Sequence, residues 1–121
     1  MKELIIFIKA YDFTLWLMNH TGKFPKSSRF SVSVRLENTL LDILEDILSA
    51  NRRRNKEYYL IKIDESLERM RILIRLSKDM RFLDIKSYEF AVKQMAEIGR
   101  LLGGWIKQQK VITAEAVINR K

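Results

Sequence analysis

Apolar residues recur at every third or fourth position through most of the chain, which is the spacing of one face of an α-helix. Four segments show this spacing: residues 4–20, the stretch that follows Ser27 or Ser28, residues 57–82 and residues 85–109. Strand-type alternation is brief, and one proline and four glycines leave few turn-forming residues. The pattern therefore predicts an all-α protein, an antiparallel up-down four-helix bundle.

The residues between these segments suit helix ends. Gly22 fits the position after a helix C-terminus, and Pro25 lies in the following loop, where it interrupts no helix. Asp84 precedes the fourth segment as a candidate N-cap. We expect a single domain, with the bundle in residues 1–110 and a weakly patterned tail, frayed or disordered, in residues 111–121.

The first two segments each have an apolar stripe, the kind of face that a bundle helix buries. In the first segment the stripe consists of Leu4, Phe7, Ile8, Tyr11, Leu15 and Met18. In the second it consists of Val32, Leu36, Leu40, Ile43, Leu44 and Ile47. The outer face of the second segment is acidic, with Asp42, Glu45 and Asp46.

The third segment is apolar over a wider arc than a simple bundle helix needs. One side of its helical wheel holds Ile63, Leu67, Met70 and Ile74. The other side holds Ile72, Leu73, Leu76, Met80 and Leu83. Together they cover about 200° of the wheel, whereas an ordinary surface helix has an apolar stripe of about 100°. We interpret the excess as a second buried contact, most economically a contact between copies of the chain. Candidate interface residues are Arg69, Ile72, Leu73, Leu76 and Met80, with Arg69 as a candidate for an interface ion pair.

The net charge of +8 is unevenly distributed. Residues 1–50 hold six lysines or arginines and six acids, so the whole excess lies in residues 51–121. A basic half favours a polyanionic partner, most commonly nucleic acid, although solubility alone also accounts for a basic protein. The cations of this half include Arg71, Arg75 and Lys78 on the polar face of the third segment, and the triplet Arg52, Arg53 and Arg54. The triplet is interpreted as a solvated helix end, a C-terminal cap or a phosphate contact.

The fourth segment carries a basic stripe with a period of seven residues: Lys86, Lys93, Arg100 and Lys107. A seven-residue repeat drifts only about 20° per step on an α-helix, so the four cations follow one line. Such a line is either a solvated bundle face or a contact surface for a phosphate backbone.

Small residues in the same segment also share a face, since Ala96, Gly99 and Gly103 are spaced at helical intervals. A glycine inside a helix costs about 0.8–1 kcal/mol relative to alanine, so a packing or functional reason is expected. The simpler interpretation is close approach of a neighbouring helix. The alternative is that this helix contacts more than one partner.

Several classes of function are disfavoured by what the chain lacks. It has no cysteine and a single histidine, His20, so it offers no thiol chemistry and no histidine cluster for a metal. We find no phosphate-binding glycine loop and no nucleophile motif, and therefore expect no catalysis and no cofactor. No apolar run approaches a membrane span, and the apolar start has no signal-peptide cleavage pattern. A cytoplasmic protein without a small-molecule substrate is expected.

Several motifs resemble the accessory variability determinant (Avd) proteins of diversity-generating retroelements. The most specific is IGRLLGGW at residues 98–105. The others are YDFTLWL at residues 11–17, FPKSSRF at 24–30, MRILIRL at 70–76 and YEF at 88–90. The resemblance extends over about residues 11–109, and the four-helix proteins of ribosomal-RNA intervening sequences are more distant relatives.

The resemblance implies a ring-shaped homopentamer of four-helix bundles with a basic surface. Such a ring binds the retroelement reverse transcriptase and its template RNA, and the complex makes adenine-mutagenised cDNA for retrohoming. The accessory subunit itself is not an enzyme. Arg71, Arg75 and Arg100 match basic positions of the family motifs, which implies contact with polymerase or nucleic acid. The same role for Lys78, Lys93, Lys107 and the arginine triplet is our own inference from charge.

Two other interpretations stay open at this stage. One is an RNA-binding protein of the intervening-sequence type that acts without a polymerase. The other is a structural oligomer whose charge serves only solubility.

Overall fold

The computed structural model describes the backbone of residues 2–119 and the side chains of residues 5–119. Within these residues the fold is all-α, without a strand. Its elements are α1 (Lys2–Thr21), the 3₁₀-helix η1 (Lys26–Ser28), the π-helix η2 (Arg29–Ser33), α2 (Val34–Arg52), α3 (Glu57–Asp79) and α4 (Ile85–Asn119). This confirms the predicted helical class and the four α-helices.

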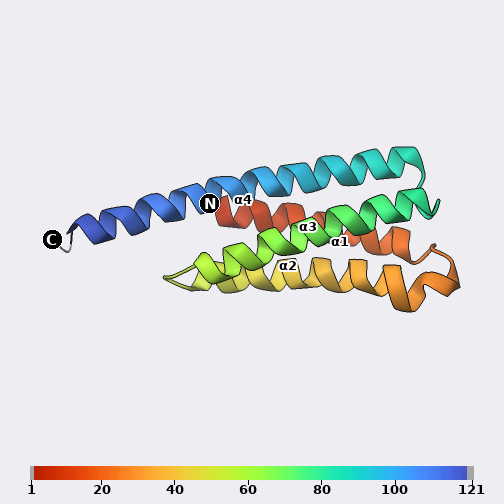
Figure 1. The fold of residues 1–121 in the computed structure, drawn as a ribbon, viewed down its shortest axis with the longest axis horizontal. Coiled ribbons are helices and arrows are strands. Elements are labelled where there is room, and N and C mark those ends of the chain that lie inside the picture. The colour runs from red at the N-terminus through yellow and green to blue at the C-terminus, as the bar shows by residue number, and fades with distance from the viewer. Residues whose placement is uncertain (1, 120–121) are drawn as a thin grey trace.

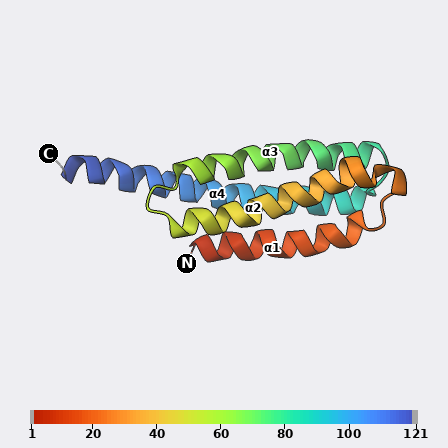
Figure 2. The ribbon, with the colours of Figure 1, turned by 90° about the horizontal axis from the view of Figure 1, so that it is seen from below.

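The four helices form an up-down bundle in which each helix reverses the direction of the one before it (Figures 1 and 2). Contacts run around the bundle, because α1 packs on both α2 and α4 while α3 packs on α2 and α4. The α2–α3 connection therefore lies at the same end as the N-terminus of α1. The other two connections lie at the opposite end (Figure 1).

The core is built from one stripe of each helix. On α2 it contains Leu36, Leu40, Ile43 and Ile47, and on α3 it contains Ile63, Leu67, Met70 and Ile74, as predicted. α4 contributes Ala91, Met95, Ile98, Leu102 and Trp105. Among the described residues, every buried side-chain nitrogen or oxygen atom has a hydrogen-bond partner, which is what a stable apolar core requires.

The stripe that α1 buries differs from the predicted one. The buried residues are Ile6, Ala10, Phe13 and Leu17, whereas Ile8, Tyr11, Leu15 and Met18 are exposed. Phe7 is half-buried, and the side chain of Leu4 lies outside the described residues. The prediction was wrong because α1 has two apolar stripes, both at helical spacing, and spacing does not tell which of them faces the core.

The helix ends also refine the sequence prediction. Asp84 caps α4, since its Oδ1 accepts a hydrogen bond from the Ser87 backbone N–H at 2.7 Å. At the start of α2, neither Ser27 nor Ser28 is the N-cap. The Ser28 hydroxyl donates instead to the Pro25 carbonyl at 2.8 Å, and the chain passes through η1 and η2 before α2 begins.

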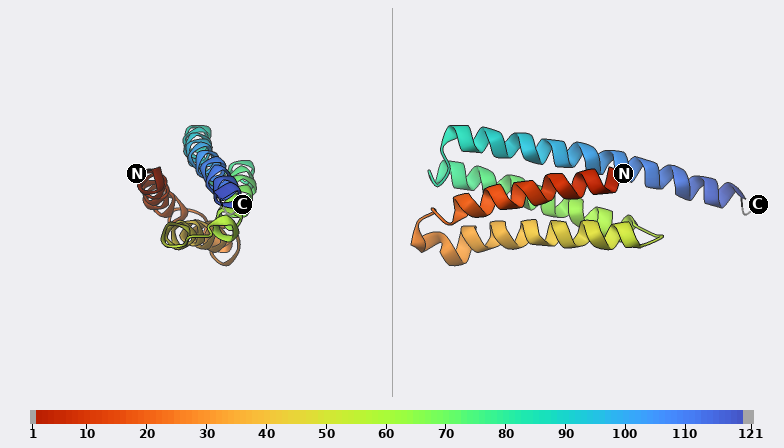
Figure 3. Two further views of the ribbon diagram at one scale, coloured as in Figure 1. Left: turned by 90° about the vertical axis from the view of Figure 1, so that its left-hand side faces the viewer. Right: turned by 180° about the vertical axis from the view of Figure 1, so that it is seen from behind.

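α4 is much longer than the segment predicted to end near residue 109. It continues to Asn119, so that residues 111–119, expected to fray, extend the helix past the α2–α3 connection (Figures 1 and 3). No glycine or proline follows Gly104, so no residue type in this stretch stops a helix. We call residues 111–119 the α4 extension; residues 120 and 121 lie outside the described part of the chain.

Candidate nucleic-acid and partner interface

The predicted basic stripe of α4 is exposed along its whole length. Lys86, Lys93, Arg100 and Lys107 point away from the bundle, opposite the buried stripe that ends in Leu102 and Trp105. Their alignment follows from the seven-residue spacing on a continuous helix. Arg100 is held in place by Glu97, whose carboxylate accepts hydrogen bonds at 2.6 and 3.1 Å. These bonds lower the pKa of Glu97 below its ordinary value.

The cations of α3 lie against α4. Arg71 forms an ion pair with Glu68, and its Nη2 atom lies close to Gly99. A Cβ atom at position 99 would be only 3.1 Å from this nitrogen. Gly99 therefore makes room for a guanidinium group rather than for the backbone of a neighbouring helix. This contact places Arg71 against the face of α4 that contains Gly99.

The other two predicted α3 cations continue the same surface. Arg75 is exposed, with Nε 4.0 Å from a carboxylate oxygen of Asp79. Lys78 reaches across to α4, where its Nζ lies 4.7 Å from the centre of the Tyr88 ring. The α3–α4 basic surface, as we name it, consists of Arg71, Arg75, Lys78, Lys86, Lys93, Arg100 and Lys107.

The arginine triplet forms a separate basic region at the α2–α3 connection. All three side chains are exposed. The C-terminus of α2 is capped by Lys56, whose Nζ donates to the carbonyl oxygens of Ala50 at 2.7 Å and Arg53 at 2.5 Å. Arg52 lies in the last turn of α2 and Arg53 is its C-cap residue, but the side chain that bonds the terminal carbonyls is that of Lys56.

The predicted interface residues of α3 divide into three groups. Ile72, Leu76 and Met80 are exposed apolar side chains, with Ile72 at 68% of full exposure. Leu73 is half-buried against the core. Arg69 points toward α2, donates a 2.9 Å hydrogen bond to Ser66 Oγ, and lines a polar cleft with the acids of α2. Leu83, counted with the outer arc, is buried in the α3–α4 connection.

A second exposed apolar face was missed by the sequence analysis. The outer α1 stripe consists of Ile5, Ile8, Tyr11, Leu15 and Met18. On α2, Leu41 and Leu48 are exposed as well. The signal was present in the helical spacing of these residues, but it had been assigned to the core. Exposed apolar stripes of this size are typical of contact surfaces.

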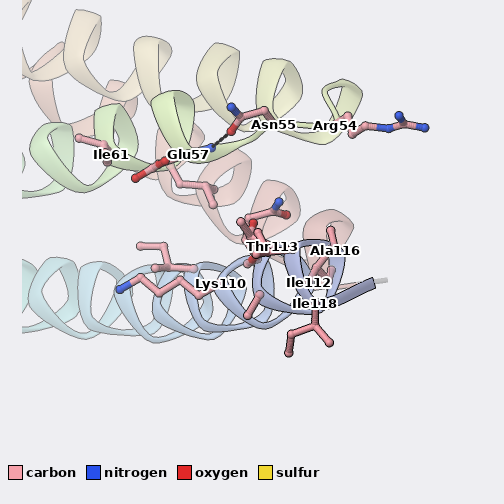
Figure 4. A pocket seen from close by; sticks show the side chains of 14 residues that line it. Arg54, Asn55, Glu57, Ile61, Lys110, Ile112, Thr113, Ala116 and Ile118 are labelled. Carbon is pink, nitrogen blue, oxygen red and sulfur yellow. Dashed lines mark hydrogen bonds between the residues drawn. The ribbon is translucent and has the colours of Figure 1, made fainter. Parts of the chain in front are cut away.

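The α4 extension borders an apolar groove (Figure 4). The groove has a volume of about 960 Å³ and lies between the start of α3 and the end of α4. Its apolar lining includes Leu60, Ile61 and Ile112, and Arg54 and Lys110 also line it. This end of the bundle thus combines exposed apolar and basic groups.

Within the part of the chain that the structure describes, no group of three or more histidine, cysteine or acidic residues is arranged to hold a metal ion. None of the described helices is both long enough and apolar enough to span a membrane.

Comparison with known proteins gives a family and relatives of the same fold. A family model described as bAvd-like matches residues 4–109. Among curated proteins, none matches the chain significantly. A crystal structure from Bacteroides thetaiotaomicron, of a protein with unknown function from the S23 ribosomal protein family, superposes with a TM-score of 0.77 at 18% identity. That similarity covers 88% of this chain and 99% of the other, and it establishes the shared fold.

Proposed function

Because the chain belongs to the bAvd-like family, we propose that it is a non-enzymatic accessory subunit of a diversity-generating retroelement. It binds the reverse transcriptase and the template RNA, and it supports adenine-mutagenic cDNA synthesis for retrohoming. The family match over residues 4–109 carries this proposal, since it includes nearly the whole bundle.

The electrostatics of the bundle support a role in RNA binding. The α3–α4 basic surface lies on the half of the chain that holds the whole excess of positive charge. Arg71 of α3 lies against α4 at Gly99, and Arg100 is exposed on α4, so cations of both helices are available to a bound nucleic acid. Each phosphate neutralised by such a cation releases counterions, which strengthens binding at low salt.

The exposed apolar faces support a ring. The outer α1 stripe and the exposed α3 residues Ile72, Leu76 and Met80 lie on different helices. One face of a copy pairs with the other face of the next copy, which is a heterologous contact. Repeated around a closed circle, this contact generates a cyclic oligomer, and we propose a homopentamer.

The oligomeric state is tested by light scattering at low and high salt. We expect a mass near five times the 14.4 kDa of one chain at both salt concentrations, because the contacts are mainly apolar. A monomer under both conditions would contradict the ring.

Binding is tested with the double variant Arg71→Ala/Arg75→Ala. We expect weaker binding of template RNA and of reverse transcriptase, and a fall of about two in the slope of log K against log salt. The control is Lys23→Ala/Lys26→Ala, which removes the same charge from exposed positions before α2. Helicity and oligomer mass stay unchanged in both. Dissociation of the ring by the arginine variant alone would assign these residues to assembly instead.

The second candidate is an RNA-binding bundle that acts without a polymerase, as in the intervening-sequence proteins. The fold that this chain shares with a member of the S23 ribosomal protein family supports this second candidate. It predicts RNA binding together with no measurable affinity for reverse transcriptase, so the same binding experiment separates the two candidates. A purely structural oligomer predicts neither.

A further inference from the structure

Two aromatic rings stand at the start of α3, and Arg53 of the arginine triplet lies against one of them. The rings of Tyr58 and Tyr59 meet edge to face, with centroids 5.0 Å apart and planes at 85°. Tyr59 is half-buried against the core, whereas Tyr58 is 64% exposed. The pair therefore fixes the position of an aromatic ring that is open to solvent.

Cations from two elements surround these rings. The guanidinium carbon of Arg53 lies 4.7 Å from the centre of the Tyr59 ring, a cation–π distance. Lys62 Nζ lies 5.4 Å from the centre of the Tyr58 ring and 5.6 Å from the centre of the Tyr59 ring. Lys62 is also bound to Asp46 at 3.3 Å, so its charge is already neutralised.

The arginines of the triplet are differently placed. Within the described residues, Arg52, Arg53 and Arg54 form no ion pair, and all three are exposed. Glu57 is the one acid in the sequence between residues 47 and 63, where five cations occur. An exposed aromatic ring in such surroundings suits a ligand that has both a planar π-face and negative charge.

We propose that Arg52, Arg53, Arg54, Tyr58 and Tyr59 form a tyrosine–arginine site for an unpaired nucleotide of single-stranded nucleic acid. The base stacks on the exposed Tyr58 ring, and Arg52 and Arg54 contact the flanking phosphates. Stacking on aromatic side chains is how single strands are bound without regard to sequence. Bases inside a duplex are already stacked on each other, so a duplex does not use the ring.

The site is distinct from the α3–α4 basic surface. Tyr58 lies thirteen residues before Arg71 on the same helix, which corresponds to about 20 Å along the helix axis. The proposal rests on the RNA-binding function proposed above and assigns two parts of one RNA to two different surfaces. Structured RNA contacts the α3–α4 basic surface, and its single-stranded flank contacts the tyrosine–arginine site.

The test compares Tyr58→Ala with Tyr58→Phe in the full chain. The probes are a 12-nucleotide single-stranded RNA of mixed sequence, the same strand annealed to its complement, and a structured retroelement template RNA, each followed by fluorescence anisotropy. We expect Tyr58→Ala to weaken single-strand binding about tenfold, and Tyr58→Phe, which keeps the ring, to stay within about twofold of the parent. Affinity for the duplex stays unchanged in both.

Two further variants separate stacking from general effects. Phe30→Ala removes an exposed aromatic ring from η2, at the other end of the bundle, and is expected to leave single-strand binding unchanged. Arg52→Ala/Arg54→Ala is expected to lower the salt slope of single-strand binding by about one to two. Circular dichroism checks that each variant keeps its helices.

Three outcomes would overturn the inference. The first is single-strand affinity that Tyr58→Ala leaves unchanged while template RNA still binds, in which case the proposed function survives without this site. The second is equal weakening of single-strand and duplex binding by Tyr58→Ala. The third is absence of binding to all three RNA probes, which would remove the proposed function as well.

Discussion

At the scale of single residues, the glycines of α4 are not equivalent. Gly99 accommodates Arg71, as described above. At Gly103 and Gly104, by contrast, a Cβ atom would meet no atom of the described chain within 4 Å outside its own part of the helix. Packing inside one copy therefore explains Gly99 alone. Gly103 and Gly104 lower the helix propensity of α4, and no contact within the described chain requires a glycine at either position.

We predict that Gly103→Ala raises the free energy of unfolding of the isolated chain by about 0.5–1 kcal/mol, through helix propensity alone. Urea denaturation at low protein concentration measures this. Gly99→Ala is the comparison, and we expect a smaller gain there because the Arg71 side chain must shift by a few tenths of an ångström. A loss of stability in Gly103→Ala would contradict the open space beside this position.

Asp84 illustrates how a single carboxylate couples helix α4 to pH. The hydrogen bond from the Ser87 backbone N–H holds the pKa of Asp84 below its ordinary value of 3.8. Because the folded pKa is the lower one, the stabilisation is present above the unfolded pKa and is lost as pH falls through the folded pKa.

Asp84→Ala should therefore lower the melting temperature at neutral pH, and the difference from the parent protein should shrink below about pH 4. Thermal unfolding by circular dichroism at pH 7 and pH 3 measures both effects. Asp84→Asn keeps a capping oxygen without the charge, so its defect should be smaller at pH 7 and should also shrink at low pH, where the parent loses its charged cap. A constant difference between Asp84→Ala and the parent at both pH values would rule out the charged cap.

At the scale of helices, the sequence predicts a helix better than it predicts which side of that helix is buried. For α2 and α3 the predicted inner stripes are the ones that face the core, with Leu36, Leu40, Ile43 and Ile47 buried on α2 and Ile63, Leu67, Met70 and Ile74 on α3, while Val32 and Leu44 are half-buried. α1 has apolar residues on two faces, and only the packing of Phe13 and Leu17 inside the bundle decides between them. The end of α4 was missed because an exposed helix needs no amphipathic pattern, only the absence of a stop signal.

Substitutions along α3 test the burial of its two apolar arcs. Ile74 is fully buried, so Ile74→Ala should lower the free energy of unfolding by about 2–5 kcal/mol. Leu73→Ala should cost less because its side chain is half-buried. Ile72→Ala serves as the exposed control, with no effect on the isolated chain. Equal costs at positions 72 and 74, measured by urea denaturation of the monomer, would contradict the bundle core.

At the scale of the whole molecule, the chain has two kinds of surface. The basic surface runs over α3 and α4, and the outer α1 stripe adds an apolar one on a different helix. The spacing of the lysines and arginines in the sequence was enough to predict the basic surface. The position of the second emerged only from the packed bundle, because an assembly contact and a core contact use the same residue types.

A charge on the outer α1 stripe should separate folding from assembly. Leu15 is exposed, so Leu15→Asp should keep the helices and the melting behaviour of the monomer while reducing the light-scattering mass toward 14.4 kDa. Ile72→Asp should do the same if α3 provides the complementary face. Asn19→Asp adds an equal charge at another exposed position of α1 and should leave the mass unchanged. Full-size assemblies of Leu15→Asp would exclude α1 from the subunit contact.

The projecting end of α4 gives the proposed ring a direction. Rotation about a single axis carries every α4 extension to the same side, so the two rims of the ring are chemically unlike. In a ring whose bundles stand along the axis, one rim would bear five apolar helix tips and the arginine triplets, and the other the α1–α2 and α3–α4 connections. A partner with no internal symmetry that approaches along the axis meets five identical sites on one rim. The first partner molecule to bind there blocks the other four sites. Such a ring would hold one polymerase for five identical subunits, an unequal stoichiometry that arises from geometry alone.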